Sequence, residues 1–208
     1  MLAGNHSKKV SSNAIKDFLF LKKFNINIHS PRPPILKEII WHPPLPSWYK
    51  CNIDGASNGN PGTAACGGVF RNNYSDFVFA FAEPLGIATS FYAELSGALR
   101  AVEIAWEKGW LNLWLETDSS LVVSTFNKSN NSVAWSLRNR WRNVHIRLKD
   151  MNIMVSHIYR EGNKVADTLA NYGLTSPALT TWDDAPFFLR DSLESNKLGM
   201  PNFRICKC

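Results

Sequence analysis

Hydrophobic and polar residues alternate in the stretch YKCNIDG, which begins at Tyr49. Tyr49, Cys51 and Ile53 take every second position, and this period of two predicts a strand that is buried on one face. Asp54 follows directly, and the glycine-rich stretch 55–62 comes after it. Because glycine and proline interrupt regular structure, we expect the strand to end at Asp54.

Two further apolar runs, residues 69–70 and 77–82, are separated by RNNYSD. Asn, Ser and Asp are turn-forming residues, so this gap predicts the loop of a hairpin. The pattern therefore predicts a domain that opens with three antiparallel strands.

A helical period follows from Ser90 to Lys108, and Gly109 stands where a helix-ending glycine is expected. The period of two returns at residues 111–115 and predicts a fourth strand that stops at Asp118. The other expected elements are helices over 119–126 and 133–149, a strand over 152–159 and a helix over 163–172. The order β-β-β-α-β-α-α-β-α is typical of an α/β domain with a mixed five-stranded sheet and helices packed on it.

The flanking regions lack this regular pattern. Residues 1–47 end in the proline-rich stretch PRPPILKEIIWHPPLPSW, which predicts an extended connector. We therefore divide the chain into an N-terminal segment and linker (1–47), a folded domain (48–176) and a C-terminal tail (177–208).

Composition narrows the class of protein. The chain has 208 residues and a formal net charge of +6, which suits a polyanionic partner such as nucleic acid but is also found in ordinary soluble proteins. Its four cysteines form no CxxC pair, and its five histidines form no HExxH motif. These patterns argue against a disulfide framework and a zinc site.

The chain has no apolar run long enough for a signal peptide or a membrane span. We therefore expect an intracellular protein, nuclear or cytoplasmic and not secreted, with no membrane partner. Nothing in the sequence indicates an obligate protein partner, so we expect a monomer.

Glu94 shares a helix stripe with Ala98, Ala101 and Ala105, which is the stripe expected to face the sheet. A carboxylate in that direction is costly unless it is paired or binds a metal ion. The alternative is an acid in the first helical turn that bends outward and favours the helix dipole.

Asp54 and Asp118 each follow a predicted strand, and each precedes a small residue. If the two strands are parallel neighbours, both carboxylates lie at one edge of the sheet, where ligands bind in open α/β sheets. Taken singly, each could be a turn or cap residue. Asp167 lies on the polar side of its helix, where periodicity favours a solvated residue, but it is near the helix N-terminal end.

Four acids in one place repel one another unless divalent cations neutralise them. Ligands that are all oxygen favour Mg²⁺ or Mn²⁺ over zinc. Two such ions can activate water and stabilise the leaving oxygen in phosphodiester cleavage.

These motifs together resemble the ribonuclease H type 1 domain: DGASNGNPG with Asp54, AEL with Glu94, ETDS with Asp118 and REGNKVADTLA with Asp167. The lead-in WHPPLPSWYKCNIDGA is similar to that of the plant reverse-transcriptase-like variant derived from non-LTR retrotransposons. The resemblance covers about residues 38 to 176.

The resemblance implies cleavage of the RNA strand in RNA–DNA hybrids by two-metal hydrolysis, leaving 5′-phosphomonoesters. It implies that Asp54, Glu94, Asp118 and Asp167 hold two Mg²⁺ ions, with Mn²⁺ as a substitute. It also implies contacts with the nucleic acid by Gly55, Ala56, Ser57, Asn58, Ser90, Arg160 and Asn163.

The sequence departs from the family in several places: Ala65 stands where glycine is usual, Ser90 and Phe91 replace the Asn-type residues often found before the AEL motif, and the basic, Trp-containing extension of some bacterial members is missing. Many members carry a histidine in a flexible loop before the last helix, whereas His157 here is expected inside a strand. Two alternatives to an active nuclease stay open: a catalytically weak or inactive nucleic-acid-binding module with the same fold, and a protein-interaction scaffold. The five basic residues in 138–149 indicate a solvated helix face or a phosphate-contacting surface.

Overall fold

The computed structural model describes residues 19–20, 22–24, 34–127 and 133–206. Most of the predicted N-terminal segment therefore lies outside the described residues. The chain divides into a compact unit, residues 38–203, and a second unit made of residues 1–37 and 204–208. A two-stranded sheet pairs β1 (Ile35–Ile39) with β8 (Asn202–Cys206).

The compact unit is built on a mixed sheet, as the sequence predicts, with strand order β6-β5-β2-β3-β4-β7. β2 pairs with β3 in antiparallel and with β5 in parallel orientation. The strands are β2 (Tyr49–Gly59), β3 (Gly62–Arg71), β4 (Phe77–Ala88), β5 (Asn112–Thr117), β6 (Asn152–His157) and β7 (Thr180–Trp182).

The sheet has six strands and not the predicted five, because the tail contributes β7. Residues 180–182 pair with Ala80, Phe81 and Ala82 at the edge of β4. A strand of three residues is too short to give a periodic pattern. Its formation depends on the edge of β4, which local sequence does not reveal.

β2 does not end at Asp54, so that prediction is wrong. Residues 55–59 continue the strand and pair with residues 62–66 of β3 in a tight hairpin. The glycines in this stretch do not interrupt the ladder, because the antiparallel partner supplies the backbone hydrogen bonds that a strand needs. What ends near Asp54 is the parallel pairing, since Asn52 lies opposite Glu116 and β5 stops at Thr117.

The helices follow the predicted order. α2 (Ser90–Glu107) begins where the Thr89 hydroxyl accepts a hydrogen bond from the Tyr92 backbone N–H, and Gly109 follows it with a φ of 72°. The predicted helix 133–149 is an α-helix flanked by two 3₁₀ turns, residues 135–137 and 148–150. This α-helix is α4 (Arg138–Arg147), and the compact unit also contains α3 (Ser120–Asn127), α5 (Lys164–Gly173) and α6 (Arg190–Lys197).

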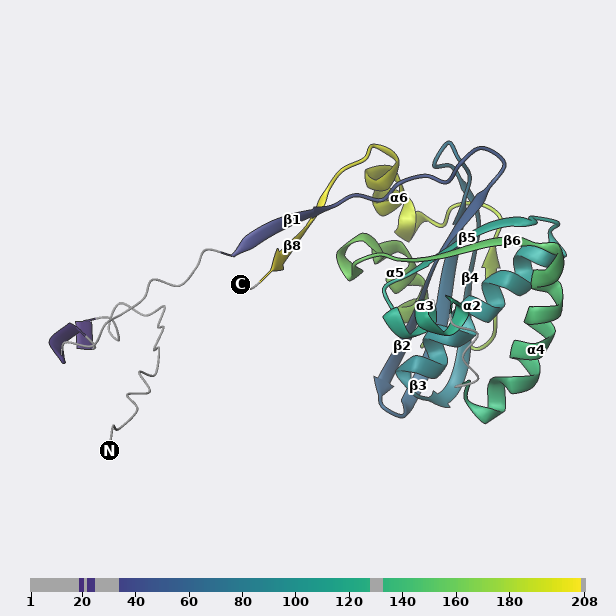
Figure 1. The fold of residues 1–208 in the computed structure, drawn as a ribbon, viewed down its shortest axis with the longest axis horizontal. Helices are drawn as coiled ribbons and strands as arrows, with labels where there is room; N and C mark the ends of the chain where they lie inside the picture. The colour runs from purple at the N-terminus through teal and green to yellow at the C-terminus, as the bar shows by residue number, and fades with distance from the viewer. Residues whose placement is uncertain (1–18, 21, 25–33, 128–132, 207–208) are drawn as a thin grey trace, which may run out of the picture. The chain divides into compact units, whose positions relative to one another are not determined.

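Helices cover both faces of the sheet (Figure 1). The larger core packs α2 and α4 against one face, with Phe70, Phe81 and Leu95 fully buried. The smaller core packs α5 and α6 against the other face and buries Leu169 and Leu189. Because Leu189 belongs to the sequence-predicted tail, that part of the tail packs on the sheet.

Residues 38–47 of the proline-rich lead-in belong to the compact unit. Trp41 is 2% exposed and lies in a small apolar cluster with Ile39 and Ile158. The compact unit 38–203 is therefore longer at both ends than the predicted domain 48–176. Among the described residues, no helix is both long and apolar enough to cross a lipid bilayer.

Candidate metal centre

Three carboxylates from three elements meet at one end of β2 and β5. Asp54 lies in β2, Glu94 is the fifth residue of α2, and Asp118 comes directly after β5. One carboxylate oxygen from each residue lies within 4.8 Å of the other two. The expectation that these three acids converge is therefore confirmed geometrically.

Gly55 allows α2 to approach β2 closely enough for this arrangement. A Cβ atom at Gly55 would lie 2.6 Å from the carbonyl carbon of Ala93 and 2.8 Å from the Cα atom of Glu94. These neighbours are helix backbone and cannot rotate away as a side chain could. The absence of a side chain at Gly55 therefore places Glu94 beside Asp54.

Burial and mutual repulsion favour the protonated forms of the cluster. Burial, followed by the charge of Asp118, raises the pKa of Asp54 to about 8, although the Gly55 N–H donates to its Oδ1 at 2.8 Å. Burial, then Asp54 and Asp118, raises the pKa of Glu94 to about 9. Burial also raises the pKa of Asp118, against the opposing charge of Arg160. Three such acids lose these protons readily only when positive charge arrives.

The donor set fits a divalent cation. Asp118 Oδ1 is buried and has no hydrogen-bond partner among the described residues, and so it is left for a ligand that the protein does not supply. All three side chains offer carboxylate oxygen, the donor that Mg²⁺ and Mn²⁺ prefer. Asp54, Glu94 and Asp118 are therefore the residues that would hold the metal.

Asp167 is not a member of the cluster of three. Its carboxylate accepts hydrogen bonds from Arg160 Nη2 at 3.2 Å and from Asn171 Nδ2 at 3.1 Å. It is close enough for its charge to raise the pKa of Asp54. Its role as a fourth ligand stays a prediction.

Arg160 and Asp167 line a cavity of about 270 Å³ together with Glu161 and Lys164. Arg160 is exposed, with a side chain that is 76% accessible. An exposed guanidinium beside an acidic centre can bind phosphate in a bidentate manner, through two parallel N–H···O hydrogen bonds.

The residues expected to contact nucleic acid lie in two settings. Residues 55–58 are part of β2, and Asn60 in the hairpin accepts a hydrogen bond from the Ser90 backbone N–H, so these positions adjoin one another. Asn163 differs, because its side chain is 1% exposed and donates to the Ile53 carbonyl at 2.9 Å. Their contacts with nucleic acid stay predictions.

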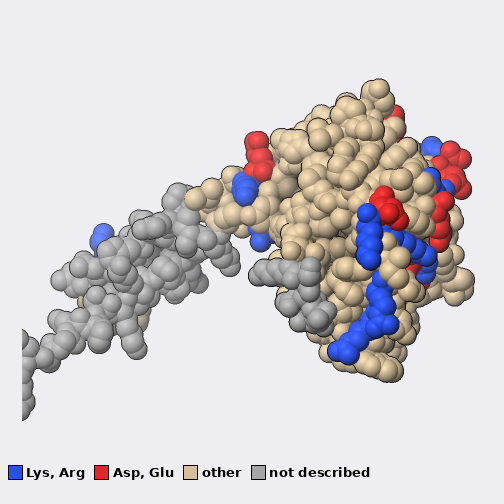
Figure 2. Space-filling model, turned by 45° about the vertical axis from the view of Figure 1, so that its right-hand side comes forward, with Lys and Arg blue, Asp and Glu red and all other residues tan. Residues whose placement is uncertain are grey.

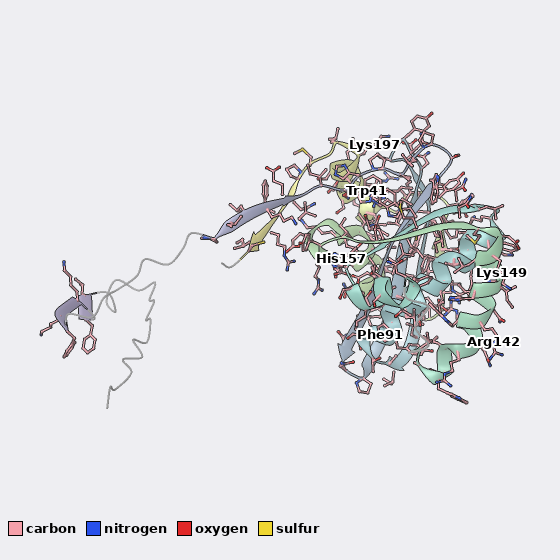
Figure 3. The ribbon with its side chains drawn as sticks, in the orientation of Figure 1. Trp41, Phe91, Arg142, Lys149, His157 and Lys197 are labelled. Atoms are coloured by element: carbon pink, nitrogen blue, oxygen red, sulfur yellow. The ribbon has the colours of Figure 1, made fainter. Side chains whose placement is uncertain are left out.

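No site role was predicted for His157, yet it lies beside the cluster. Its Nε2 lies 3.1 Å from the Asp118 carbonyl oxygen, and its ring is exposed. Figure 3 shows the labelled side chain at the end of β6. Its position at the end of the strand next to the one that carries Asp118 is the signal that could have found it.

Comparisons with known proteins agree with this geometry. The family described as "Reverse transcriptase-like" matches residues 52–173. An Arabidopsis thaliana protein named "Putative ribonuclease H protein" is 35% identical over 177 residues, which are 84% of this chain and 28% of that protein. Ribonuclease HI of Halobacterium salinarum is 34% identical over 128 residues, which are 59% of this chain and 62% of that protein.

The fold agrees as well. The crystal structure of RNase H1 from Halobacterium salinarum NRC-1 matches 61% of this chain and 96% of that one, with 31% identity and a TM-score of 0.55. The matched part of this chain spans 28% of the Arabidopsis protein and 62% of the Halobacterium protein, which is less than two thirds of the length of each.

Proposed function

Because the chain belongs to the reverse transcriptase-like family and shares the ribonuclease H fold, we propose that it is a metal-dependent endonuclease that hydrolyses the RNA strand of RNA–DNA hybrids. The observation that carries the proposal is the convergence of Asp54, Glu94 and Asp118, with an unpartnered oxygen on Asp118. The ribonuclease H names of two relatives support the choice of substrate.

The residues of the site have separate tasks in this proposal. Two divalent ions, Mg²⁺ or Mn²⁺, would activate a water molecule and stabilise the leaving oxygen. Asp54, Glu94 and Asp118 would hold the ions in an orientation that Gly55 and α2 fix. Asp167 and Arg160 lie at the margin, where the acid would complete the ligand set and the guanidinium would bind a phosphate of the hybrid.

The hairpin of β2 and β3 would meet the sugar–phosphate backbone. Residues 55–58 and Ser90 present backbone and small side chains there, which lets a nucleic acid strand come close. A 2′-hydroxyl in that position is the group that distinguishes RNA from DNA.

Helix α4 would extend the surface for the hybrid. Arg138 and Arg142 are exposed and line a cavity of about 450 Å³ with Trp141 and His145. Figure 2 shows Lys and Arg side chains gathered in a stripe on the face turned forward. Figure 3 shows Arg142 pointing outward from α4 and Lys149 pointing outward from the 3₁₀ turn that follows it. Arg140 is not free for this task, because it donates two hydrogen bonds to Glu103 at 2.7 Å each.

Cleavage of an end-labelled RNA–DNA hybrid by the full chain in Mg²⁺ tests the proposal. We expect endonucleolytic cutting of the RNA strand that EDTA abolishes, and a loss of at least about 100-fold in Asp118→Asn, because one ligand and one charge are removed. Arg190→Glu, an exposed change on α6, is the matched control and should keep wild-type activity.

Three other outcomes distinguish the alternatives. Equal cutting by wild type and Asp118→Asn would mean that a contaminating nuclease is responsible. Hybrid binding without cutting would favour a nucleic-acid-binding module. Neither binding nor cutting would leave the protein-interaction scaffold.

A further inference from the structure

A buried polar network lies next to the metal centre in the compact unit. Its six residues are at most 6% exposed. We call Trp41, Lys50, Asn52, Arg71, Glu116 and Asn163 the buried polar network. Polar groups at this depth are costly unless they bond to one another.

Asn52 is the hub of this network. Its Oδ1 accepts hydrogen bonds from Trp41 Nε1 at 2.8 Å and from Arg71 Nη2 at 2.7 Å. Its Nδ2 donates to Glu116 Oε2 at 3.0 Å and to Asn163 Oδ1 at 3.2 Å. All four hydrogen-bonding positions of the amide are therefore used, which fixes its orientation.

Each of three network residues precedes one of the site acids by a short distance along its own element. Asn52 is two residues before Asp54 on β2, and Glu116 is two residues before Asp118 after β5. Residues two apart on a strand face the same way, so Asn52 and Asp54 share one face of β2. Asn163, at the start of α5, is four residues before Asp167, which is about one helical turn.

The hub therefore links the three backbones that carry these acids. Asn163 strengthens the link, because its Nδ2 also donates to the carbonyl of Ile53, the residue before Asp54. A rotation of the Asn52 amide would disturb all three at once.

Trp41 is the network residue that precedes β2 in the chain, and it donates a hydrogen bond to Asn52. It comes from the lead-in and lies beyond the family match at residues 52–173. Besides its N–H bond to Asn52, its ring covers the Arg71 guanidinium at 3.6 Å. Arg71 Nε and Nη1 have no hydrogen-bond partner among the described residues, so the ring faces a guanidinium that the network leaves partly unsatisfied.

We propose that Trp41 is a positioning residue for the metal centre: its indole N–H and ring fix Asn52, and Asn52 aligns the backbones that present Asp54, Asp118 and Asp167. The inference rests on the proposed function for its catalytic readout, but the metal affinity of the free protein tests it independently. In this proposal the lead-in contributes a residue that positions the metal ligands.

The experiment compares Trp41→Phe and Trp41→Ala with wild type in the full chain. Phenylalanine keeps an aromatic ring near Arg71 but lacks the N–H donor and is smaller than indole, a loss of size that a Trp→Phe control shares. Alanine removes both the ring and the donor. Trp110→Phe is the matched control. Trp110 is a partly buried tryptophan that stacks on Tyr49 and packs against the larger core.

Three quantities are measured for each protein: the thermal unfolding midpoint in EDTA, the affinity of the metal-free protein for Mn²⁺ by calorimetry, and hybrid cleavage against Mg²⁺ concentration. We expect Trp41→Phe to weaken Mn²⁺ affinity about fivefold, the effect of about one hydrogen bond. Trp41→Ala should weaken it about 10-fold, as changes behind a metal ligand do. The Mg²⁺ concentration for half-maximal cutting should rise by the same factors, while Trp110→Phe leaves both unchanged.

A lower unfolding midpoint with unchanged Mn²⁺ affinity in Trp41→Phe would overturn the inference, since a merely structural tryptophan affects only stability. An equal loss of Mn²⁺ affinity in Trp110→Phe and Trp41→Phe would also overturn the inference. If Trp41→Ala does not fold, the Phe variant alone decides. If wild type binds Mn²⁺ but does not cut, the proposed function fails, and the Mn²⁺ affinities still decide the role of Trp41.

Discussion

Asp54 and Glu94 show how burial sets the chemistry of single residues in this site. Each is a carboxylic acid that would be ionised well below neutral pH in water, yet burial and neighbouring acids raise their pKa values to about 8 and about 9. The same crowding that disfavours the anions would favour a divalent cation at the cluster. The position of Glu94 was predictable from its alanine-lined stripe, because helical periodicity is local. The burial that shifts its pKa is not local and required the fold.

The raised pKa values predict that the metal-free protein loses stability as pH rises. The unfolded chain releases these protons near pH 4, whereas the folded chain keeps them to about pH 8 or 9. The folded state therefore binds more protons across this window, so its stability is greatest at the acidic end and declines toward pH 9. The thermal midpoint in EDTA should fall by about 2–4 °C for each 1 kcal/mol lost.

Two comparisons check this pH dependence. Mg²⁺ at saturation should flatten the fall, since it binds the ionised cluster, and Asp54→Asn should reduce the fall without metal. A metal-free midpoint that rises steadily from pH 5 to pH 9 would contradict the predicted sign.

At the scale of elements, the site depends on how closely α2 lies against β2. Sequence periodicity placed both elements, and the strand–helix order followed from it. The predicted end of β2 at Asp54 was wrong. Glycine in residues 55–59 locally favours a break, but these residues form a paired strand, and α2 packs against it at Gly55. The distance between the two elements is a tertiary property that Gly55 permits.

Gly55→Ala should separate α2 from β2 and weaken the metal site. The new Cβ would overlap helix backbone, so we expect a loss of about 1–3 kcal/mol in the free energy of unfolding and a clear loss of Mn²⁺ affinity. Urea denaturation and calorimetry measure the two effects.

Gly109→Ala is the matched control for Gly55→Ala. Gly109 has a φ of 72° and open space around its Cβ position, so alanine there costs stability through backbone strain alone. Its Mn²⁺ affinity should equal that of wild type. Equal affinities in both variants would show that the approach of α2 does not position the metal ligands.

Helix α4 carries a prediction about nucleic acid binding. Arg138→Glu together with Arg142→Glu should raise KM for the hybrid and leave kcat nearly unchanged, because both side chains are exposed and lie on a different element from the three acids. The fall of log affinity with log salt concentration should become less steep by about two, which is about one for each lost phosphate contact. An unchanged salt slope would mean that α4 does not contact phosphate; Arg190→Glu is the control for added negative charge.

At the scale of the whole molecule, the compact unit includes parts that the sequence placed outside the domain. Leu189 and Leu193 from the tail pack with Val69 and Leu169, and β7 extends the sheet. Short strands and single buried side chains give weak local patterns, so only the surface that they cover reveals them. The tail thereby covers the side of the sheet on which α5 lies.

Leu189→Ala tests whether the tail folds together with the rest. Its side chain is fully buried, so the change should cost about 2–5 kcal/mol in the free energy of unfolding and still give a single transition in urea. Leu198→Ala is the control, because Leu198 is 68% exposed and should cost less than about 0.5 kcal/mol. A cost for Leu189→Ala as small as that of the control would mean that the tail is not part of the cooperative unit.

The sequence by itself determined the order of strands and helices and the positions of the four acids along it. These follow from the periods of 2 and 3.6 residues and from short motifs, which are local properties of a chain. Only the tertiary structure decided that Asp54, Glu94 and Asp118 share one centre while Asp167 pairs with Arg160. The same holds for the burial of Trp41 among charged side chains, because contacts between residues far apart in the chain depend on how closely the elements pack.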